Sequence, residues 1–417
     1  MKIVIATDLY APMINGVAVF SYNLAVGLKE RGHEVLVLAP SLDGKLSIQK
    51  EGGVRVGRLS SLRLPFYPDQ IEKIPETRKI LGYKVPKILY KNGLHVSLVP
   101  YYEIKKVLDD FLPDVIHIQT PGPIAIAASQ YVKRRGVATV VTGHAYPDNF
   151  TSQIKFMKPV KKPIDSVIRA YFGSFLRKAD YATMPTKMAI HDLLPRGRGK
   201  FKTPVEAISN GIDLSKFRAV KAPAEMYAKY DIPKDRLIVG YVGRVDPEKS
   251  MGVLVEAFAK VARKVPEAYL VVVGDGTDRA RLEKMAGELE ISESVKFLGR
   301  IVGDDLPVIY RAFDMFAITS ETETQSIVLM EAMATGLPAV AVRAGAIGEL
   351  VLNGRNGFLC KPGDVDGVAK GLVKLLGDKE MRVAYGRESR EIVKKHDVNY
   401  TLSRFEEIYA KVAKSRK

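Results

Sequence analysis

The chain has 417 residues, enough for two or three domains that each bury a hydrophobic core, which excludes a small scaffold dependent on disulfide bonds or metal ions. Hydrophobic residues make up 47% of the sequence and charged residues 27%, the balance of a globular protein, so a long disordered tail is excluded as well. The net charge of +17 is uneven, because residues 1–205 hold 31 Lys and Arg against 16 Asp and Glu, whereas residues 206–417 hold 33 against 31. This asymmetry indicates an anionic partner of the N-terminal half, either nucleic acid or an acidic membrane surface, or else a basic face that only aids solubility.

The first half of the sequence alternates apolar strands with helices. Residues 2–7 form an apolar strand, and the helical spacing of apolar residues predicts a helix over 17–31 that Gly32 ends. This alternation predicts a parallel sheet with helices on both faces. The other elements expected here are strands at 34–39, 115–119 and 138–142 and an Ala-rich helix at 124–135.

The same pattern restarts in the second half, so we expect an α/β protein of two tandem Rossmann-like, doubly wound domains. Turn residues gather at 210–224, where the domains would join. A last helix at 400–417 has an apolar face to bury and is expected to return to the first domain. The predicted division is 1–205, 206–395 and 396–417. The second domain is expected to contain strands at 237–242, 269–273, 315–319 and 339–342 and helices at 251–265, 279–289 and 326–335.

Ligands of open α/β sheets bind outside the carboxyl ends of the strands, so the loops that follow strands are the candidate site. The loop that begins at Gly243 carries Arg244 and Lys249. A guanidinium and a mobile ammonium together suit a diphosphate, although loop cations are usually only solvated.

The loop after strand 315–319 leads into an apolar helix. The backbone amides of Thr324, Gln325 and Ser326 at this helix start could bind the same diphosphate, while Glu323 and Glu331 could hold hydroxyl groups of a sugar and a ribose. The alternative for the loop acids is that they only complement the helix dipole. Glu331, however, lies in an apolar stretch where an unpaired carboxylate is costly, so it needs a partner.

Several segments, taken in order, resemble the retaining glycosyltransferases of family 4. The pair Glu323 and Glu331 matches that family's motif of two glutamates separated by seven residues. The family's fold, called GT-B, has two Rossmann-like domains that face a cleft, with a C-terminal helix that crosses back to the N-terminal domain. The segments that carry the resemblance are YVGRVDPEKS, VVVGDGTDRARLE, SNGIDLSKF, ETETQSIVLMEAMATGLPAV and GELVLNGRNGFLCKPGD.

The resemblance implies roles for individual residues. Arg244 and Lys249 would neutralise the leaving diphosphate, Glu323 would hold hydroxyls of the donor sugar, and Glu331 would hold the ribose. Thr324 and Ser326 stand where glycine is usual in the family, with little expected consequence because the helix amides remain. The backbone near Arg300 and Ile301 would contact the nucleobase.

The N-terminal domain would contribute two further residues to this site. Gly16, in the loop 15–17, matches a glycine loop that lets the backbone approach the diphosphate, although the family more often has a glycine pair. His144 matches the family's histidine near the donor sugar, and a lone histidine is otherwise more often structural.

The resemblance also implies transfer with retention of configuration and without a metal or other cofactor. The donor would be a UDP- or GDP-linked sugar, and the cations and helix amides would offset the diphosphate charge. The triplet 364–366, Asp-Val-Asp, looks like a metal signature, but it follows a Pro-Gly turn and opens a helix, so helix capping explains it better.

The acceptor is expected to be a membrane lipid, because SLRLPFYPDQ, HIQTPGP and GHAYPDNF are similar to bacterial diacylglycerol glucosyltransferases and phosphatidylinositol mannosyltransferases. Apolar residues interleave with the basic residues of this region, which suits an anionic bilayer. The alternative is that the apolar side of a helix at 164–178 packs against its own domain's core. The lysines predicted to face the acceptor or membrane are Lys84, Lys87, Lys155, Lys158, Lys161 and Lys162.

We expect a cytoplasmic protein that binds the inner face of the membrane peripherally. Cys360 has no second cysteine to pair with, and the first apolar run ends at Asp8, too soon for a signal peptide. Two alternatives stay open: a soluble sugar or sugar phosphate as acceptor, and a nucleotide-sugar epimerase on the same fold. Nucleic acid is not an expected partner, because the basic segment 196–200 lacks an aromatic platform beside it.

Overall fold

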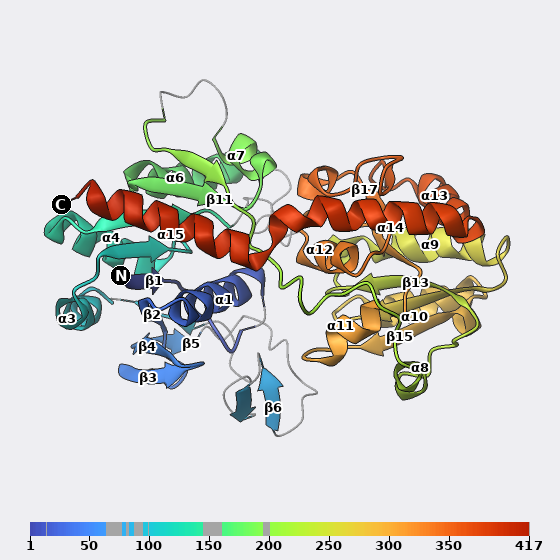
Figure 1. Ribbon diagram of the computed structural model, residues 1–417, viewed down its shortest axis with the longest axis horizontal. Coiled ribbons are helices and arrows are strands. Elements are labelled where there is room, and N and C mark those ends of the chain that lie inside the picture. The colour runs from blue at the N-terminus through green and yellow to red at the C-terminus, as the bar shows by residue number, and fades with distance from the viewer. Residues whose placement is uncertain are drawn as a thin grey trace. The chain divides into compact units, whose positions relative to one another are not determined.

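A computed structural model describes residues 1–13, 15–63, 77–80, 83–86, 95–98, 100–144, 161–194 and 201–416. The chain divides into two compact units (Figure 1). Unit 1 comprises Met1–Asn210 together with Asn399–Lys417, and unit 2 comprises Gly211–Val398. These divisions lie a few residues beyond those expected at 205 and 395.

Unit 1 contains an eight-stranded sheet in the order β12-β11-β10-β9-β1-β2-β4-β3 within its described residues. Neighbouring strands are parallel except β3 and β4, which pair antiparallel. Two short antiparallel pairs, β5 with β8 and β6 with β7, lie apart from this sheet. The strands are β1 (Lys2–Ala6), β2 (Glu34–Pro40), β3 (Ser47–Glu51), β4 (Val54–Leu59), β5 (Leu62–Arg63), β6 (Thr77–Ile80), β7 (Tyr83–Pro86), β8 (His95–Val96), β9 (Val115–Ile118), β10 (Ala138–Thr142), β11 (Tyr181–Met184) and β12 (Val205–Ala207).

Helices cover both faces of this sheet, because alternate residues of each strand point to opposite sides. Val4 and Ile116 join a buried cluster with residues of α3, α4, α6 and α7. On the other face, α1 and α15 pack together, with Gly27 of α1 against Leu402 of α15. The helices are α1 (Gly16–Glu30), α3 (Tyr101–Phe111), α4 (Pro123–Arg135), α6 (Lys161–Lys178), α7 (Lys187–Leu193) and α15 (Val398–Lys414).

Unit 2 contains a six-stranded, all-parallel sheet in the order β15-β14-β13-β16-β17-β18. One buried cluster packs α8, α11 and α12 on one face, and a second packs α9, α10 and α13 on the other. The strands are β13 (Leu237–Val242), β14 (Ala268–Val273), β15 (Val295–Gly299), β16 (Met315–Ile318), β17 (Ala339–Val342) and β18 (Gly357–Cys360). The helices are α8 (Ala224–Lys229), α9 (Met251–Ala262), α10 (Arg279–Glu288), α11 (Asp305–Tyr310), α12 (Ile327–Ala334), α13 (Val365–Gly377) and α14 (Lys379–Val393), with 3-10 turns at Pro247–Lys249, Ser292–Ser294, Gly345–Glu349 and Lys394–His396.

The predicted return of the last helix to the first domain is confirmed. Helix α15 belongs to unit 1 from Asn399 onward and follows α14 along the chain after the 3-10 turn Lys394–His396 (Figure 1). Its buried residues recur with helical spacing, and its other side forms ion pairs such as Arg404 with Glu206 and Glu406 with Arg31. The buried positions are Thr401, Leu402, Phe405, Ile408, Tyr409 and Val412.

Each sheet has one switch point, a pair of neighbouring strands whose chains continue to opposite sides of the sheet. Ligands of α/β sheets bind at such a point. In unit 1 it lies between β1 and β9, since β2 follows on one side and β10 on the other. In unit 2 it lies between β13 and β16, since β14 follows on one side and β17 on the other. The loops after these strands are therefore the candidate ligand-binding loops of each unit. Among the helices that the structure describes, none has both the length and the apolar run required to span a bilayer.

Candidate functional site

The loop after β13 is held in place by β13 itself and by the loop that follows β14. The Tyr241 hydroxyl donates to the Arg244 carbonyl at 2.8 Å. The amide of Val245 donates to the carbonyl of Asp275 at 3.0 Å, and the Asp246 carboxylate accepts from both the amide and the hydroxyl of Thr277 at 3.0 Å. These bonds fix the backbone from which the two predicted cations project.

Both predicted cations of this loop contact carboxylates. Arg244 is 43% exposed and binds Asp246 at 2.6 Å and Glu248. The Lys249 ammonium lies 2.9 Å from Oε1 of Glu323, and these two side chains are only 15% and 11% exposed. The structure therefore brings Lys249 and Glu323, which are 74 residues apart in sequence, into direct contact across the switch point.

The N-terminus of α12 lies at the same edge of the sheet. Ser326 precedes the helix, and its hydroxyl is buried without a hydrogen-bond partner in the described residues. The Glu323 carbonyl accepts from the Ala346 amide at 2.9 Å, and a Cβ atom on Gly345 would lie 2.1 Å from that carbonyl oxygen. Gly345, with φ of +49°, thus allows the close approach that fixes the backbone of Glu323.

Glu331 has the partner that its apolar surroundings require. The hydroxyl of Tyr310 donates to Oε2 of Glu331 at 2.8 Å. Burial nevertheless raises the pKa of Glu331 to about 7, because the charged carboxylate is poorly solvated there. The expectation that Glu331 needs a partner is therefore confirmed, whereas the sequence did not point to Tyr310.

Arg300 and Ile301 follow β15, two strands away from β13 in the same sheet. Ile301 is buried, and the adjoining Gly299 carbonyl accepts from the Gly274 amide at 2.8 Å. They lie at the carboxyl edge that also carries Arg244.

Gly16 begins α1 in unit 1. The side chain of Asn15 caps this helix by accepting from the Ala18 amide at 2.9 Å. Gly16 is exposed, and a Cβ atom there would meet no other atom within 4 Å. No contact within the described residues requires glycine at this position.

His144 lies just beyond β10 and is 8% exposed. Its Nε2 atom is 2.7 Å from Oε1 of Gln119, and its ring lies 4.9 Å from that of Phe20. Because Oε1 is an acceptor, Nε2 carries the proton and Nδ1 is an acceptor. Burial lowers the pKa of His144 to about 3, so the imidazole is neutral at neutral pH. Gln119 was missed as a site residue, although it lies within the HIQTPGP segment.

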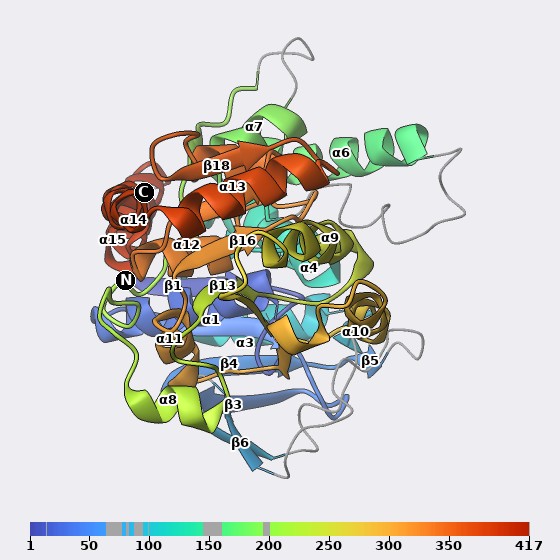
Figure 2. The ribbon, with the colours of Figure 1, turned by 90° about the vertical axis from the view of Figure 1, so that its right-hand side faces the viewer.

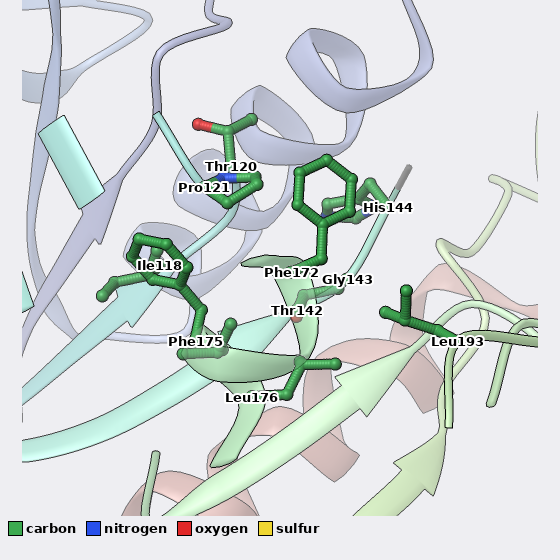
Figure 3. Close-up of a pocket in the computed structure, with 11 residues that line it drawn as sticks. Ile118, Thr120, Pro121, Thr142, Gly143, His144, Phe172, Phe175, Leu176 and Leu193 are labelled. Carbon is green, nitrogen blue, oxygen red and sulfur yellow. The ribbon is translucent and has the colours of Figure 1, made fainter. Parts of the chain in front are cut away.

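A small pocket borders His144 (Figure 3). Its lining comes from the ends of β9 and β10 and from α6 and α7, and it is mostly apolar. Phe172 and Phe175 of α6 also pack against the core, whereas Val167 and Tyr171 on the same helix are 69% and 40% exposed. The core-packing alternative therefore holds for one side of this helix, and membrane binding by its exposed side stays a prediction. The lining residues are Ile118, Thr120, Pro121, Val141, Thr142, Gly143, His144, Phe172, Phe175, Leu176 and Leu193.

For most of the lysines predicted to face the acceptor or membrane, the structure does not describe the side chain. Lys84 lies in β7, which pairs antiparallel with β6. Lys161 and Lys162 begin α6, and the structure does not describe their side chains. Lys87, Lys155 and Lys158 lie outside the described residues, as does the basic segment 196–200.

Asp364 caps α13, as predicted. Its carboxylate accepts from the Gly367 amide at 2.8 Å, and Asp366 pairs with Lys260 at 2.7 Å. Within the parts of the chain that the structure describes, no group of three or more His, Cys, Asp or Glu residues could hold a metal ion.

Two Rossmann-like units with a returning C-terminal helix define the GT-B class of glycosyltransferases. A family model described as Glycosyltransferase Family 4 matches residues 14–216, and one described as Glycosyl transferases group 1 matches residues 224–392. The chain belongs to the family 4 glycosyltransferases, as its motifs suggested.

Named relatives match most of the chain. It is 31% identical over 335 residues to the sulfoquinovosyl transferase SQD2 of Arabidopsis thaliana. The matched region covers 78% of this chain and 62% of the plant protein. The chain thus spans about three fifths of the length of that relative. It is 26% identical over 367 residues to the alpha-monoglucosyldiacylglycerol synthase of Acholeplasma laidlawii, covering 86% of this chain and 84% of the relative.

Solved structures share the whole fold at lower identity. Sucrose-phosphate synthase from Thermosynechococcus elongatus has a TM-score of 0.77 at 20% identity, with 99% of each chain covered. HepE from Anabaena, solved in complex with UDP-glucose, has a TM-score of 0.71 at 18% identity, with 99% of this chain and 100% of that chain covered. At such identities the likeness establishes the fold.

Proposed function

We propose that this glycosyltransferase moves a hexose, glucose or mannose, from a UDP- or GDP-linked donor to a membrane lipid, with retention of configuration and without a metal. Diacylglycerol or a phosphoinositide is the acceptor class we favour. The Acholeplasma relative, named as an alpha-monoglucosyldiacylglycerol synthase, supports the lipid acceptor, and the HepE complex with UDP-glucose supports the donor class.

The observation that carries this proposal is the contact of Lys249 with Glu323 at the switch point of unit 2, with Arg244 and the start of α12 at the same edge. A diphosphate bound there would meet a guanidinium, an ammonium and the helix amides of residues 324–326, including that of Gln325. It would replace the carboxylates that Arg244 and Lys249 now contact.

The remaining residues receive the roles that the family resemblance implies. Glu323, released from Lys249 by the diphosphate, would accept hydrogen bonds from donor-sugar hydroxyls. Glu331 would hold the ribose, and the backbone at Arg300 and Ile301 would contact the base. Gly16 leaves open space in which a diphosphate can approach the backbone.

The proposed reaction breaks the bond between the anomeric carbon and the diphosphate oxygen. Arg244 and Lys249 stabilise the negative charge that develops on the departing diphosphate. The acceptor hydroxyl adds to the same face of the sugar, and its proton passes to the leaving phosphate oxygen. The neutral His144 ring would accept a hydrogen bond from a sugar hydroxyl at Nδ1.

The surface of unit 1 supports a lipid acceptor. Of the large apolar side chains exposed in the described residues, twelve belong to unit 1 and only Val220 and Val383 belong to unit 2. Residues 1–205 also carry nearly all of the net positive charge. Exposed apolar groups among cations are typical of proteins that bind anionic membranes reversibly.

A donor panel followed by a transfer assay tests the proposal. UDP-glucose, UDP-galactose and GDP-mannose are compared by thermal shift, because a ligand of the folded state raises its melting temperature. The stabilising donor is then supplied with diacylglycerol or phosphatidylinositol vesicles, with and without EDTA, and with a soluble sugar in parallel. Lipid transfer that survives EDTA and keeps the α-anomeric configuration of the donor is expected. Stabilisation by none of the donors, or transfer to the soluble sugar alone, would contradict the proposal.

A further inference from the structure

The support beneath His144 comes from two neighbouring strands of unit 1. β9 and β10 pair in parallel, and the side chains of His117 and Gln119 meet those of Thr142 and His144. Nε2 of His117 lies 2.6 Å from Oγ1 of Thr142, and the Gln119 contact to His144 repeats this pairing two residues further on. His117 lies on β9 and Thr142 on β10, and Gln119 and His144 follow them by two residues, just beyond the strand ends.

The side of the sheet on which His117 lies is the one that α15 covers. The Tyr409 hydroxyl lies 2.7 Å from Nδ1 of His117, although the two residues are 292 positions apart. Tyr409 and His117 are both completely buried. Thr142 extends the chain of hydrogen bonds to Thr183 at 2.6 Å, and the Gly143 amide donates to the Thr183 carbonyl at 2.9 Å.

Aromatic rings form a second connection between the same helix and His144. The Phe405 ring of α15 lies 5.0 Å from that of His117 and 6.0 Å from that of Phe20. Phe20 in turn lies 4.9 Å from the ring of His144. Close-packed rings transmit a displacement, because the interior leaves no free volume to absorb it.

We propose that Tyr409 is a positioning residue for His144, acting through His117, Thr142 and the backbone at Gly143. Helix α15 thereby supplies part of the donor-sugar site of unit 1, although its chain enters this unit only after all of unit 2. The inference depends on the proposed function, in which His144 contacts the donor sugar.

The geometry explains why the hydroxyl matters. Burial keeps the pKa of His117 well below its usual value, so the ring is neutral and has one donor and one acceptor nitrogen. With Tyr409 on one nitrogen and Thr142 on the other, both nitrogens are satisfied and the ring has one orientation. Without the hydroxyl, Nδ1 of His117 would be buried without a hydrogen-bond partner. The ring would then rotate, or a water molecule would enter to bind Nδ1.

The test replaces Tyr409 by Phe, which keeps the ring and removes the hydroxyl. Tyr400→Phe is the matched control, because Tyr400 is on the same helix and 61% exposed. In Tyr409→Phe we expect kcat to fall about tenfold with the donor KM nearly unchanged, because the donor diphosphate binds to unit 2. In a His144→Ala background the same substitution should cost nothing further, since Tyr409 acts through His144.

A spectroscopic measurement separates this inference from the proposed function. In protein labelled at its six histidines, Tyr409→Phe should shift the ring signals of both His117 and His144, and Tyr400→Phe neither. Unchanged His144 signals, or an equal loss of kcat in the His144→Ala background, would overturn the positioning role. Absence of transfer in the unmodified protein would instead refute the proposed function, and the histidine signals would still decide this inference. If Tyr409→Phe does not fold, Phe405→Leu, which removes the ring between His117 and Phe20, tests the second connection from α15 to His144, and unchanged His144 signals in that variant would count against the contribution of α15.

Discussion

The Nζ atom of Lys249 lies 2.9 Å from Oε1 of Glu323, and both side chains are largely shielded from solvent. Lys249 ends a 3-10 turn after β13, and Glu323 precedes α12 after β16. Partly buried charges are screened less than exposed ones, so each of these groups depends on the other. The pair therefore aligns the two loops that frame the switch point before any donor binds.

Lys249→Ala and Glu323→Ala are each expected to lower the transfer rate at least about 100-fold, because each removes a group proposed to act on the donor. Either variant also leaves a poorly solvated charge without its partner, so both should melt below the wild type. The double variant should regain part of the lost melting temperature and no activity. Initial rates at saturating donor and thermal melts measure both effects.

Two control variants at positions outside the proposed site accompany these substitutions. Lys260→Ala breaks a surface ion pair of α9 with Asp366, and Glu321→Ala removes an exposed acid of the same loop as Glu323. Both should keep near-normal transfer, since exposed ion pairs contribute little. Near-normal rates in Lys249→Ala or Glu323→Ala would contradict the site assignment.

Gly345→Ala should displace Glu323. The added methyl group would lie 2.1 Å from the Glu323 carbonyl oxygen, and φ of +49° disfavours alanine there. We expect at least a tenfold loss of kcat/KM for the donor, because small displacements of positioning groups are costly. Gly348→Ala in the same turn is the control, since its methyl group would lie 4.0 Å from the nearest atom, on Leu359. Equal kinetics in the two variants would refute the positioning role of Gly345.

Much of the fold was predictable because it depends on local patterns. The strands β10, β13 and β17 were predicted to the residue from their short apolar runs. Helix ends were less well predicted: the apolar spacing extended the helix after Met251 to residue 265, whereas α9 ends at Ala262 and the chain turns there with Val265 bonded to the Val261 carbonyl.

The sequence predicted individual residues of the site, but not the partners that reach them from distant parts of the chain. The burial of Glu331 in an apolar helix predicted a partner, but nothing local identifies Tyr310, which is 21 residues away on another helix. In the same way, the sequence offers no sign that Gln119 would bind His144 or that Tyr409 would reach His117. Such pairs arise from strand order and helix packing, which one sequence does not specify residue by residue.

Glu331 should make stability depend on pH. Its pKa is raised from 4.5 to about 7 by burial, so between these values the folded protein binds the proton more tightly than the unfolded chain does. The contribution of this group to the free energy of unfolding is therefore lost as the pH rises through that window. In Glu331→Gln the free energy of unfolding, measured by urea titration, should fall less than in the wild type between about pH 5 and pH 7.5.

Two further variants sharpen the pH experiment. Tyr310→Phe removes a donor that stabilises the ionised carboxylate, so the loss of stability with rising pH should be steeper than in the wild type. Glu321→Gln, at an exposed position, should leave the pH profile unchanged. Identical profiles for the wild type and Glu331→Gln would show that Glu331 does not titrate in this range.

The basic region of unit 1, defined here by Lys155, Lys158, Lys161 and Lys162, should bind anionic membranes. We expect the protein to sediment with vesicles that contain about 30% phosphatidylglycerol and not with neutral vesicles, and about 0.5 M salt should weaken the binding because it screens exposed charges. Four Lys→Glu substitutions at 155, 158, 161 and 162 should lower the partition coefficient at least about tenfold, since each cation near the surface contributes about 1 kcal/mol.

The control for this charge reversal replaces four exposed lysines of unit 2 by Glu. It changes the net charge of the whole chain by the same amount as the quadruple variant of unit 1. If the basic region binds the bilayer, the control should keep most of its vesicle binding, because only charges within about 10 Å of the surface are felt at 0.1 M salt. Equal losses in both quadruple variants would show that net charge alone drives the binding. Sedimentation that does not distinguish anionic from neutral vesicles would remove the membrane surface as a partner. The four control positions are Lys234, Lys284, Lys370 and Lys395.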